Sequence, residues 1–187
     1  MRKLVLNKPA SLWFCGLSGA GKTTVSLQLK TLIEKKTETG VVLLDGDEMV
    51  KLFSSSHVDH SEDARTERVK KYLQLVGILL KTPNLLPVVV MINHSSSLRQ
   101  MIKDSPLSGH YFEVFINTSI DLCKLRDPKG HYQKAEKSAV PQMIGIDLPF
   151  NMPGNPDVEI SEKSSPEEAA ETIFQQLCKE GIFISNG

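Results

Sequence analysis

Residues 16–24 read GLSGAGKTT, in which Gly16 is followed after four residues by Gly21, Lys22 and Thr23. This is the spacing of a phosphate-binding loop. Its glycines let backbone N–H groups point at phosphate oxygens, its lysine adds charge at the β- and γ-phosphates, and its threonine hydroxyl is a magnesium ligand. The loop therefore predicts a site for a nucleoside triphosphate such as ATP, with Mg²⁺. The alternative is a glycine-rich turn between a strand and a helix.

Two acids lie in the segment LLDGDE, where Asp45 and Asp47 follow an apolar run. Ligands of open α/β sheets gather at the carboxyl ends of the strands, so we expect both carboxylates beside the phosphate loop. There the pair could order magnesium and accept the proton of an attacking hydroxyl group. The alternative is structural, because acids also cap helices and occupy their first turns.

Several basic residues are candidates for binding an anionic substrate: Arg65, Arg68, Lys70, Lys71 and Arg99. Helical spacing places Arg65 and Arg68 on one face of a predicted helix, where their guanidinium groups could clamp a planar anion. The alternative is a solvated helix face, which we favour for Lys70 and Lys71.

Short apolar runs and helical patterns predict the elements that position these residues. Runs rich in β-branched residues predict strands at 11–15, 41–45, 87–92, 111–116 and 157–160. Apolar residues recur at helical spacing over 22–36 and 61–81, and Ser165 with Pro166 predicts the start of a last helix. This alternation indicates an α/β fold of the P-loop NTPase type: a three-layer sandwich with a mostly parallel five-stranded sheet and helices on both faces.

One long segment, residues 127–156, breaks the alternation and is rich in proline and glycine. A segment of this length with little regular pattern is functional or disordered in most domains. Because it contains lysines and apolar residues, we expect an active-site lid over about residues 127–153, with a flexible linker as the alternative.

Length and composition predict a single domain over residues 1–187, since 40% of the residues are apolar. Basic and acidic residues number 22 each, which argues against a nucleic-acid partner. Three widely spaced cysteines, Cys15, Cys123 and Cys178, indicate reduced thiols and a cytoplasmic protein. No apolar run reaches the length of a signal peptide or membrane span, so we expect no membrane partner.

Two other site types are disfavoured. The five histidines lack the spacing of zinc ligands. The segment DPKG at 127–130 has the D-x-x-G spacing of GTPases, but it follows a helical pattern rather than a strand, and no guanine-reading N-K-x-D is present.

The segments LWFCGLSGAGKTT, LDGDE, EVFINTSIDLCKLRDPKGHYQKA and IGIDLPFNMPGNPDVEI resemble the adenylylsulfate kinase (APS kinase) family over about residues 11–160. The resemblance implies transfer of the γ-phosphoryl group of ATP to the 3′-hydroxyl of adenylyl sulfate, with magnesium and in a homodimer. The small-molecule partner would thus be a nucleotide.

The resemblance also implies roles for individual residues. Asp47 would align or deprotonate the acceptor hydroxyl, Thr23 and Asp45 would hold magnesium, and Arg126 would lie near the adenine of ATP. Ser96 falls where the family has a serine described as a phosphoserine intermediate, which direct in-line transfer does not need. The ATP phosphates would be held by Gly16, Leu17, Ser18, Gly19, Ala20, Gly21, Lys22, Thr23 and Thr24. The acceptor would be bound by Arg65, Arg68, Arg99, Lys129, Lys134 and Ile146.

The chain departs from the family pattern on the acceptor side. Val50 stands where the family has an arginine, Arg68 where it has an asparagine, and Met143 near its stacking aromatic residue, and the family's SPYR is replaced by SSLR at 96–99. Lost stacking and bidentate contacts would weaken or redirect acceptor recognition. Two alternatives therefore remain: a kinase for another nucleotide conjugate, such as a cytidine diphosphate derivative, and a non-catalytic nucleotide-binding module.

Overall fold

The computed structural model describes residues 3–53, 59, 61–136 and 142–185. Its main element is a five-stranded sheet of order β3-β4-β2-β5-β6, in which every neighbouring pair is parallel. The strands are β2 (Ser11–Cys15), β3 (Gly40–Asp45), β4 (Leu85–Val90), β5 (Tyr111–Asn117) and β6 (Val158–Ser161). The five predicted strands and the predicted fold class are confirmed, with strand ends that differ by two residues at most.

Helices cover the sheet and its carboxyl edge. In the described part of the chain they are α1 (Lys22–Lys36), α2 (Gly46–Phe53), α3 (Glu62–Leu79), α4 (Ser96–Lys103), α5 (Ile120–Arg126), α6 (His131–Glu136) and α7 (Pro166–Lys179). The predicted helices at 22–36 and 61–81 correspond to α1 and α3. Ser165 and Glu168 form a full capping box at the start of α7, which satisfies two backbone N–H groups that the helix leaves free.

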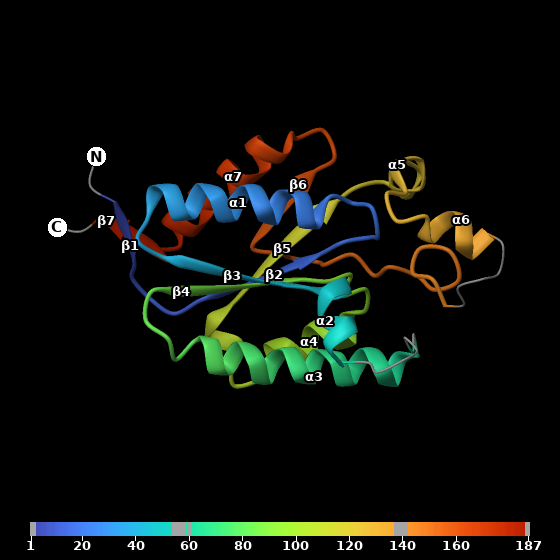
Figure 1. The fold of residues 1–187 in the computed structure, drawn as a ribbon, viewed down its shortest axis with the longest axis horizontal. Coiled ribbons are helices and arrows are strands. Elements are labelled where there is room, and N and C mark those ends of the chain that lie inside the picture. The colour runs from blue at the N-terminus through green and yellow to red at the C-terminus, as the bar shows by residue number, and fades with distance from the viewer. Residues whose placement is uncertain (1–2, 54–58, 60, 137–141, 186–187) are drawn as a thin grey trace.

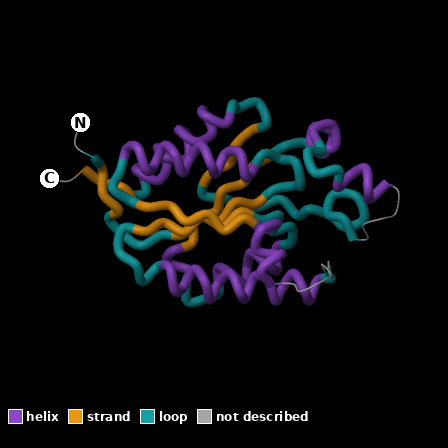
Figure 2. Tube along the Cα trace, viewed as in Figure 1, coloured by secondary structure: helices purple, strands orange, loops and turns teal. Residues whose placement is uncertain are grey.

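Figures 1 and 2 show three layers, with α1 and α7 on one face of the sheet and α3 and α4 on the other. Leu29 of α1 and Ile173 of α7 are fully buried in the first interface. Tyr72 of α3 and Ile102 of α4 pack with Trp13 of β2 in the second. Each such side chain contributes about 1.5–3 kcal/mol by leaving water, so both faces of the sheet are held by apolar packing.

A second, two-stranded antiparallel sheet joins the two ends of the described chain. Strand β1 (Leu4–Leu6) pairs with β7 (Phe183–Ser185) in the register Leu4 to Ser185. The sequence did not predict this sheet, because each strand has three residues and its partner lies far away along the chain. Figure 1 shows the pair at the end of the molecule opposite α5 and α6.

The parallel topology brings the carboxyl ends of all five main strands to one edge. The phosphate loop follows β2, Asp45 ends β3, and residues 91–95 follow β4. Helices α5 and α6 lie beyond this edge (Figure 1). Of the predicted lid, residues 137–141 fall outside the described part of the chain. No described helix is long and apolar enough to cross a membrane.

Candidate active site

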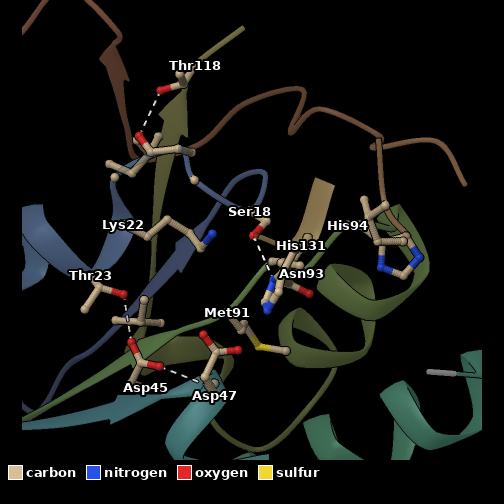
Figure 3. Close-up of a pocket in the computed structure, with 18 of the residues that line it drawn as sticks. Ser18, Lys22, Thr23, Asp45, Asp47, Met91, Asn93, His94, Thr118 and His131 are labelled. Carbon is tan, nitrogen blue, oxygen red and sulfur yellow. Dashed lines mark hydrogen bonds between the residues drawn. The ribbon is translucent and has the colours of Figure 1, made fainter. Parts of the chain in front are cut away.

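A cavity of about 800 Å³ lies at the carboxyl edge of the sheet (Figure 3), a volume suited to a small ligand. The phosphate loop, the start of α2, α3, the loop after β4 and parts of the lid form its walls. The predicted site residues that line it are Ser18, Gly19, Ala20, Gly21, Lys22, Thr23, Thr24, Asp45, Asp47, Arg65, Arg68, Arg126, Lys129 and Lys134. The fold therefore brings most of the predicted site together.

The loop between β2 and α1 has a backbone that requires glycine. Gly16, Gly19 and Gly21 have φ angles of 145°, 74° and 105°. A Cβ atom on Gly16 would lie 2.7 Å from the carbonyl oxygen of Ile116, so a larger residue would force the loop away from β5. Gly16 and Leu17 begin the loop and are not among the described lining residues, whereas Ser18 to Thr24 are.

Lys22 is buried at the centre of the loop. Its ammonium group donates hydrogen bonds to the carbonyl oxygens of Gly16 and Leu17, at 3.0 and 2.7 Å. Burial penalises the charged form and lowers the pKa of Lys22 to about 8. A phosphate group in the loop would reverse this effect, because it favours the charged ammonium.

Asp45 lies between a threonine of the loop and the next acid. One of its carboxylate oxygens accepts a hydrogen bond from the Thr23 hydroxyl at 2.8 Å, and the other accepts one from the backbone N–H of Asp47 at 3.0 Å. The second contact caps the start of α2, as the structural interpretation of Asp45 predicted. A hydroxyl and a carboxylate this close fit magnesium, which takes few protein ligands and completes its shell with phosphate oxygens and water.

Asp47 forms an ion pair with Lys129 of the lid. Burial alone would raise the pKa of the Asp47 carboxyl, but the hydrogen bond and charge of Lys129 outweigh it, so the pKa lies below its usual value. The Asp47 carboxyl is therefore ionised at neutral pH, and Figure 3 shows it beside Asp45.

The two arginines of α3 face the cavity together. Arg65 donates a hydrogen bond to the carbonyl oxygen of Gln142 at 3.0 Å, and Arg68 donates one to that of Asp59 at 2.8 Å. Both line the cavity, as the helical spacing predicted. They place two positive charges in the cavity wall.

The predicted lid segment contacts the phosphate loop directly. The Tyr132 hydroxyl donates a hydrogen bond to the carbonyl oxygen of Ser18 at 3.0 Å, and the His131 ring lies 3.4 Å from the Ser18 hydroxyl. Arg126 reaches the carbonyl oxygen of Ala20 at 3.4 Å. The phosphate loop is thus hydrogen-bonded to α6 through Tyr132 and to the end of α5 through Arg126.

Besides Gly16 and Leu17, three predicted site residues are not among the described residues that line the cavity. Ser96 is the exposed first residue of α4, and Ile146 is 38% exposed. Arg99 is 5% exposed, and its guanidinium donates to the carbonyl oxygens of Asn93 at 2.8 Å and Asn151 at 2.7 Å. The structure thus places Arg99 behind the cavity wall, where it joins the loop after β4 to the end of the lid.

Several lining residues were not predicted. Asn93, His94 and Thr118 follow the ends of β4 and β5, and none of them belongs to a recognisable local motif. His94 is buried, and its Nε2 atom lies 3.2 Å from a carboxylate oxygen of Glu62; burial lowers the pKa of His94. The available signal was position alone, because residues after parallel strands lie at the ligand-binding edge.

Comparison with known proteins agrees with this geometry. A family model described as adenylylsulphate kinase matches residues 8–161. An adenylyl-sulfate kinase of Vibrio cholerae is 38% identical over 168 residues, which are 89% of this chain and 77% of that protein. An adenylyl-sulfate kinase of Pseudomonas aeruginosa is 34% identical over 172 residues, or 91% and 86% of the two chains.

A solved structure supports the same relationship. The Mycobacterium tuberculosis APS kinase CysC, in complex with AMPPNP and APS, superposes with a TM-score of 0.84 at 28% identity, covering 91% of this chain and 98% of that one. The resemblance read from the motifs is confirmed. This chain belongs to the adenylylsulphate kinase family and is a kinase.

Proposed function

We propose that this enzyme transfers the γ-phosphoryl group of ATP to the 3′-hydroxyl of adenylyl sulfate. The observation that carries the proposal is one cavity bounded by Lys22 of the phosphate loop, the ionised Asp47 and the paired Arg65 and Arg68. Family membership supports this acceptor over the alternatives.

The phosphate loop would hold the donor. Backbone N–H groups of residues 18–24 and the Lys22 ammonium would bind the ATP phosphates, and Arg126 would lie near the adenine. Thr23 and Asp45 would hold Mg²⁺, which neutralises charge on the transferred phosphoryl group. Their contact at 2.8 Å supports this assignment.

The opposite wall would hold the acceptor. Asp47 would orient the attacking hydroxyl and take its proton, and the charges of Arg65 and Arg68 would bind the phosphosulfate. Lys129 and Lys134 would close over both nucleotides as part of the lid, residues 127–153. The departures Val50, Arg68 and Met143 all line the cavity, so acceptor choice is the point to test.

The test is a coupled assay of purified enzyme with ATP, Mg²⁺ and adenylyl sulfate, beside a panel of cytidine and uridine diphosphate conjugates. We expect 3′-phosphoadenylyl sulfate as the main product. Transfer to a conjugate instead, or tight ATP binding with no transfer, would refute the proposal. The matched control is Lys22→Ala, which should abolish turnover; undiminished activity would remove the loop from the mechanism.

Two further proposals have direct measurements. Transfer would be direct, so mass spectrometry after turnover should find no phosphate on Ser96. We also propose a homodimer and a cytoplasmic location, to be checked by light scattering of the purified protein and by cell fractionation.

A further inference from the structure

The side-chain amide of Asn93 is a buried polar group without a protein partner. Asn93 is 3% exposed and lines the cavity. In the described part of the chain neither its Nδ2 nor its Oδ1 atom has a hydrogen-bond partner. Buried amide groups are nearly always paired, because losing hydrogen bonds to water without replacement is costly. Such a group at a ligand cavity indicates that a ligand completes it.

The backbone holds Asn93 beside the phosphate loop. The carbonyl oxygen of the preceding residue, Ile92, accepts a hydrogen bond from the N–H of Gly16 at 3.2 Å. The carbonyl oxygen of Asn93 itself accepts one from Arg99 at 2.8 Å. The backbone here is thus hydrogen-bonded to the first glycine of the phosphate loop through Ile92 and to a buried arginine through Asn93.

Its conformation also suits a binding role. Asn93 has φ of 46°, in the left-handed region that asparagine tolerates better than most residues. Strand β4, which precedes it, lies between β2 with the phosphate loop and β3 with the acid pair. In the view of Figure 3, Asn93 lies between Lys22 and His94.

The chemistry of the amide limits the ligand group. Its oxygen needs a hydrogen-bond donor and its nitrogen needs an acceptor. Phosphate oxygens at neutral pH offer acceptors and would leave Oδ1 unpaired. A vicinal diol offers both functions side by side, since each hydroxyl group donates and accepts.

We infer that Asn93 recognises the ribose of the acceptor nucleotide through the 2′-hydroxyl, next to the 3′-hydroxyl that is phosphorylated. This inference rests on the proposed function, which brings the 3′-hydroxyl between the phosphate loop and Asp47. The 2′-hydroxyl is one carbon–carbon bond away, so it must lie at the same end of the cavity. Turning about its two side-chain torsions, Asn93 pairs with the diol and selects a ribonucleotide acceptor.

The test compares kcat/KM for adenylyl sulfate and its 2′-deoxy analogue in the wild type and in Asn93→Gly. Glycine removes the amide and accepts the left-handed backbone. The matched control is Asn84→Gly, since Asn84 also has positive φ, 54°, but is exposed and outside the cavity lining that the structure describes. Thermal unfolding of all three proteins shows whether the variants fold.

We expect the wild type to prefer the ribose form by about tenfold to hundredfold. In Asn93→Gly, kcat/KM for adenylyl sulfate should fall by the same tenfold to hundredfold and become equal to that for the 2′-deoxy analogue. Asn84→Gly should keep the wild-type preference. Removing an unpaired amide should also leave the unfolding temperature of Asn93→Gly no lower than that of Asn84→Gly.

Two results would overturn the inference while leaving the proposed function intact: a wild type that does not discriminate, or an Asn93→Gly variant that discriminates as well as the wild type. In the second case, an equal loss of activity on both acceptors would mean that the amide contacts another part of the nucleotide, such as the base edge, rather than the 2′-hydroxyl. Failure of the wild type to phosphorylate adenylyl sulfate at all would refute the proposed function, and this inference with it.

Discussion

Arg99 and Glu113 form a buried ion pair, with Arg99 Nε 3.4 Å from Glu113 Oε1 and both side chains almost fully enclosed. Glu113 lies on β5, next to the central strand β2, and also pairs with Lys103 at 3.2 Å. The arginine in turn bonds the backbone of Asn93 and Asn151, so the pair connects the sheet to the cavity wall and to the end of the lid.

Replacing Arg99 by leucine should therefore destabilise the protein by about 3–5 kcal/mol, because Glu113 would lose a buried partner. The double variant Arg99→Leu with Glu113→Leu should recover part of that loss. Urea unfolding of the two single variants and the double variant measures the coupling, and additive effects would show that the pair does not interact.

Binding of ATP should weaken as pH rises through about 8. Free Lys22 has a pKa near that value because of burial, against 10.5 for an unperturbed lysine, and phosphate binding needs the charged form. Well above pH 8 the free enzyme must take up a proton to bind, which reduces affinity by about tenfold per pH unit. Calorimetric titration at pH 7 to 9.5 in two buffers checks both affinity and proton uptake.

The lowered pKa of Lys22 also predicts that the stability of the ligand-free protein increases with pH, whereas ATP affinity decreases. Because its pKa is lower in the folded state, the unfolded chain binds more protons between about pH 8 and 10.5. The contribution of Lys22 to stability should therefore rise across that window. Comparing the pH dependence of unfolding with that of Lys22→Met isolates the effect, and parallel curves would contradict it.

Changing Asp47 to asparagine should lower kcat by about 10²–10⁴-fold, while Kd for ATP changes by no more than a few-fold. The amide keeps the shape of the side chain but cannot take a proton. Glu48→Gln is the control, since Glu48 is the exposed next residue of α2. Equal losses of turnover and ATP affinity would assign Asp47 a structural role.

Removing the charge of Lys129 should move the acid limb of the pH–rate profile to higher pH. Lys129 holds the pKa of Asp47 below its usual value, so Lys129→Gln raises that pKa and Asp47 becomes protonated at a less acidic pH. Lys134→Gln, which neutralises a lid lysine without an ion pair to Asp47, should leave the limb in place. An equal shift of the acid limb in both variants would show that the loss of any positive charge nearby, rather than of the Lys129–Asp47 ion pair, changes the pKa.

Gly145→Ala should destabilise the protein by about 1–3 kcal/mol. Gly145 has φ of 90°, and an added Cβ would lie 2.9 Å from Ile120 and 3.0 Å from Leu17 of the phosphate loop. Gly154→Ala is the control, since a Cβ there meets no described atom within 4 Å. Equal stability of the two variants would show that Gly145 is not closely packed against Ile120 and Leu17.

The sequence predicted those features whose signals are local. The phosphate loop and the acids at 45 and 47 are defined by spacing along the chain, and the five main strands by continuous apolar runs that parallel sheets bury on both faces. Arg65 and Arg68 share a helix face, which fixed spacing also reveals.

The remaining features depend on contacts between distant segments. The sequence led us to expect Arg99 to bind the substrate. It could not show that Arg99 forms a buried ion pair with Glu113 of β5, which lies 14 residues further along the chain. Asn93 and His94 belong to no motif, and their importance follows from the strand order, which places β4 between the phosphate loop and the acids. Strand order is not encoded in any short stretch of residues.

The pairing of β1 with β7 joins a strand that is synthesised early to one that is synthesised late. The last strand of the main sheet ends at residue 161. Strand β1, by contrast, can pair only after β7 has been synthesised, because Leu4 is paired with Ser185. Helix α7, which covers α1, is also among the last elements to appear. Until α7 has been made, the apolar side of α1 around Leu29 lacks part of its cover, so this face of the sheet cannot be fully buried before the last part of the described chain has been synthesised.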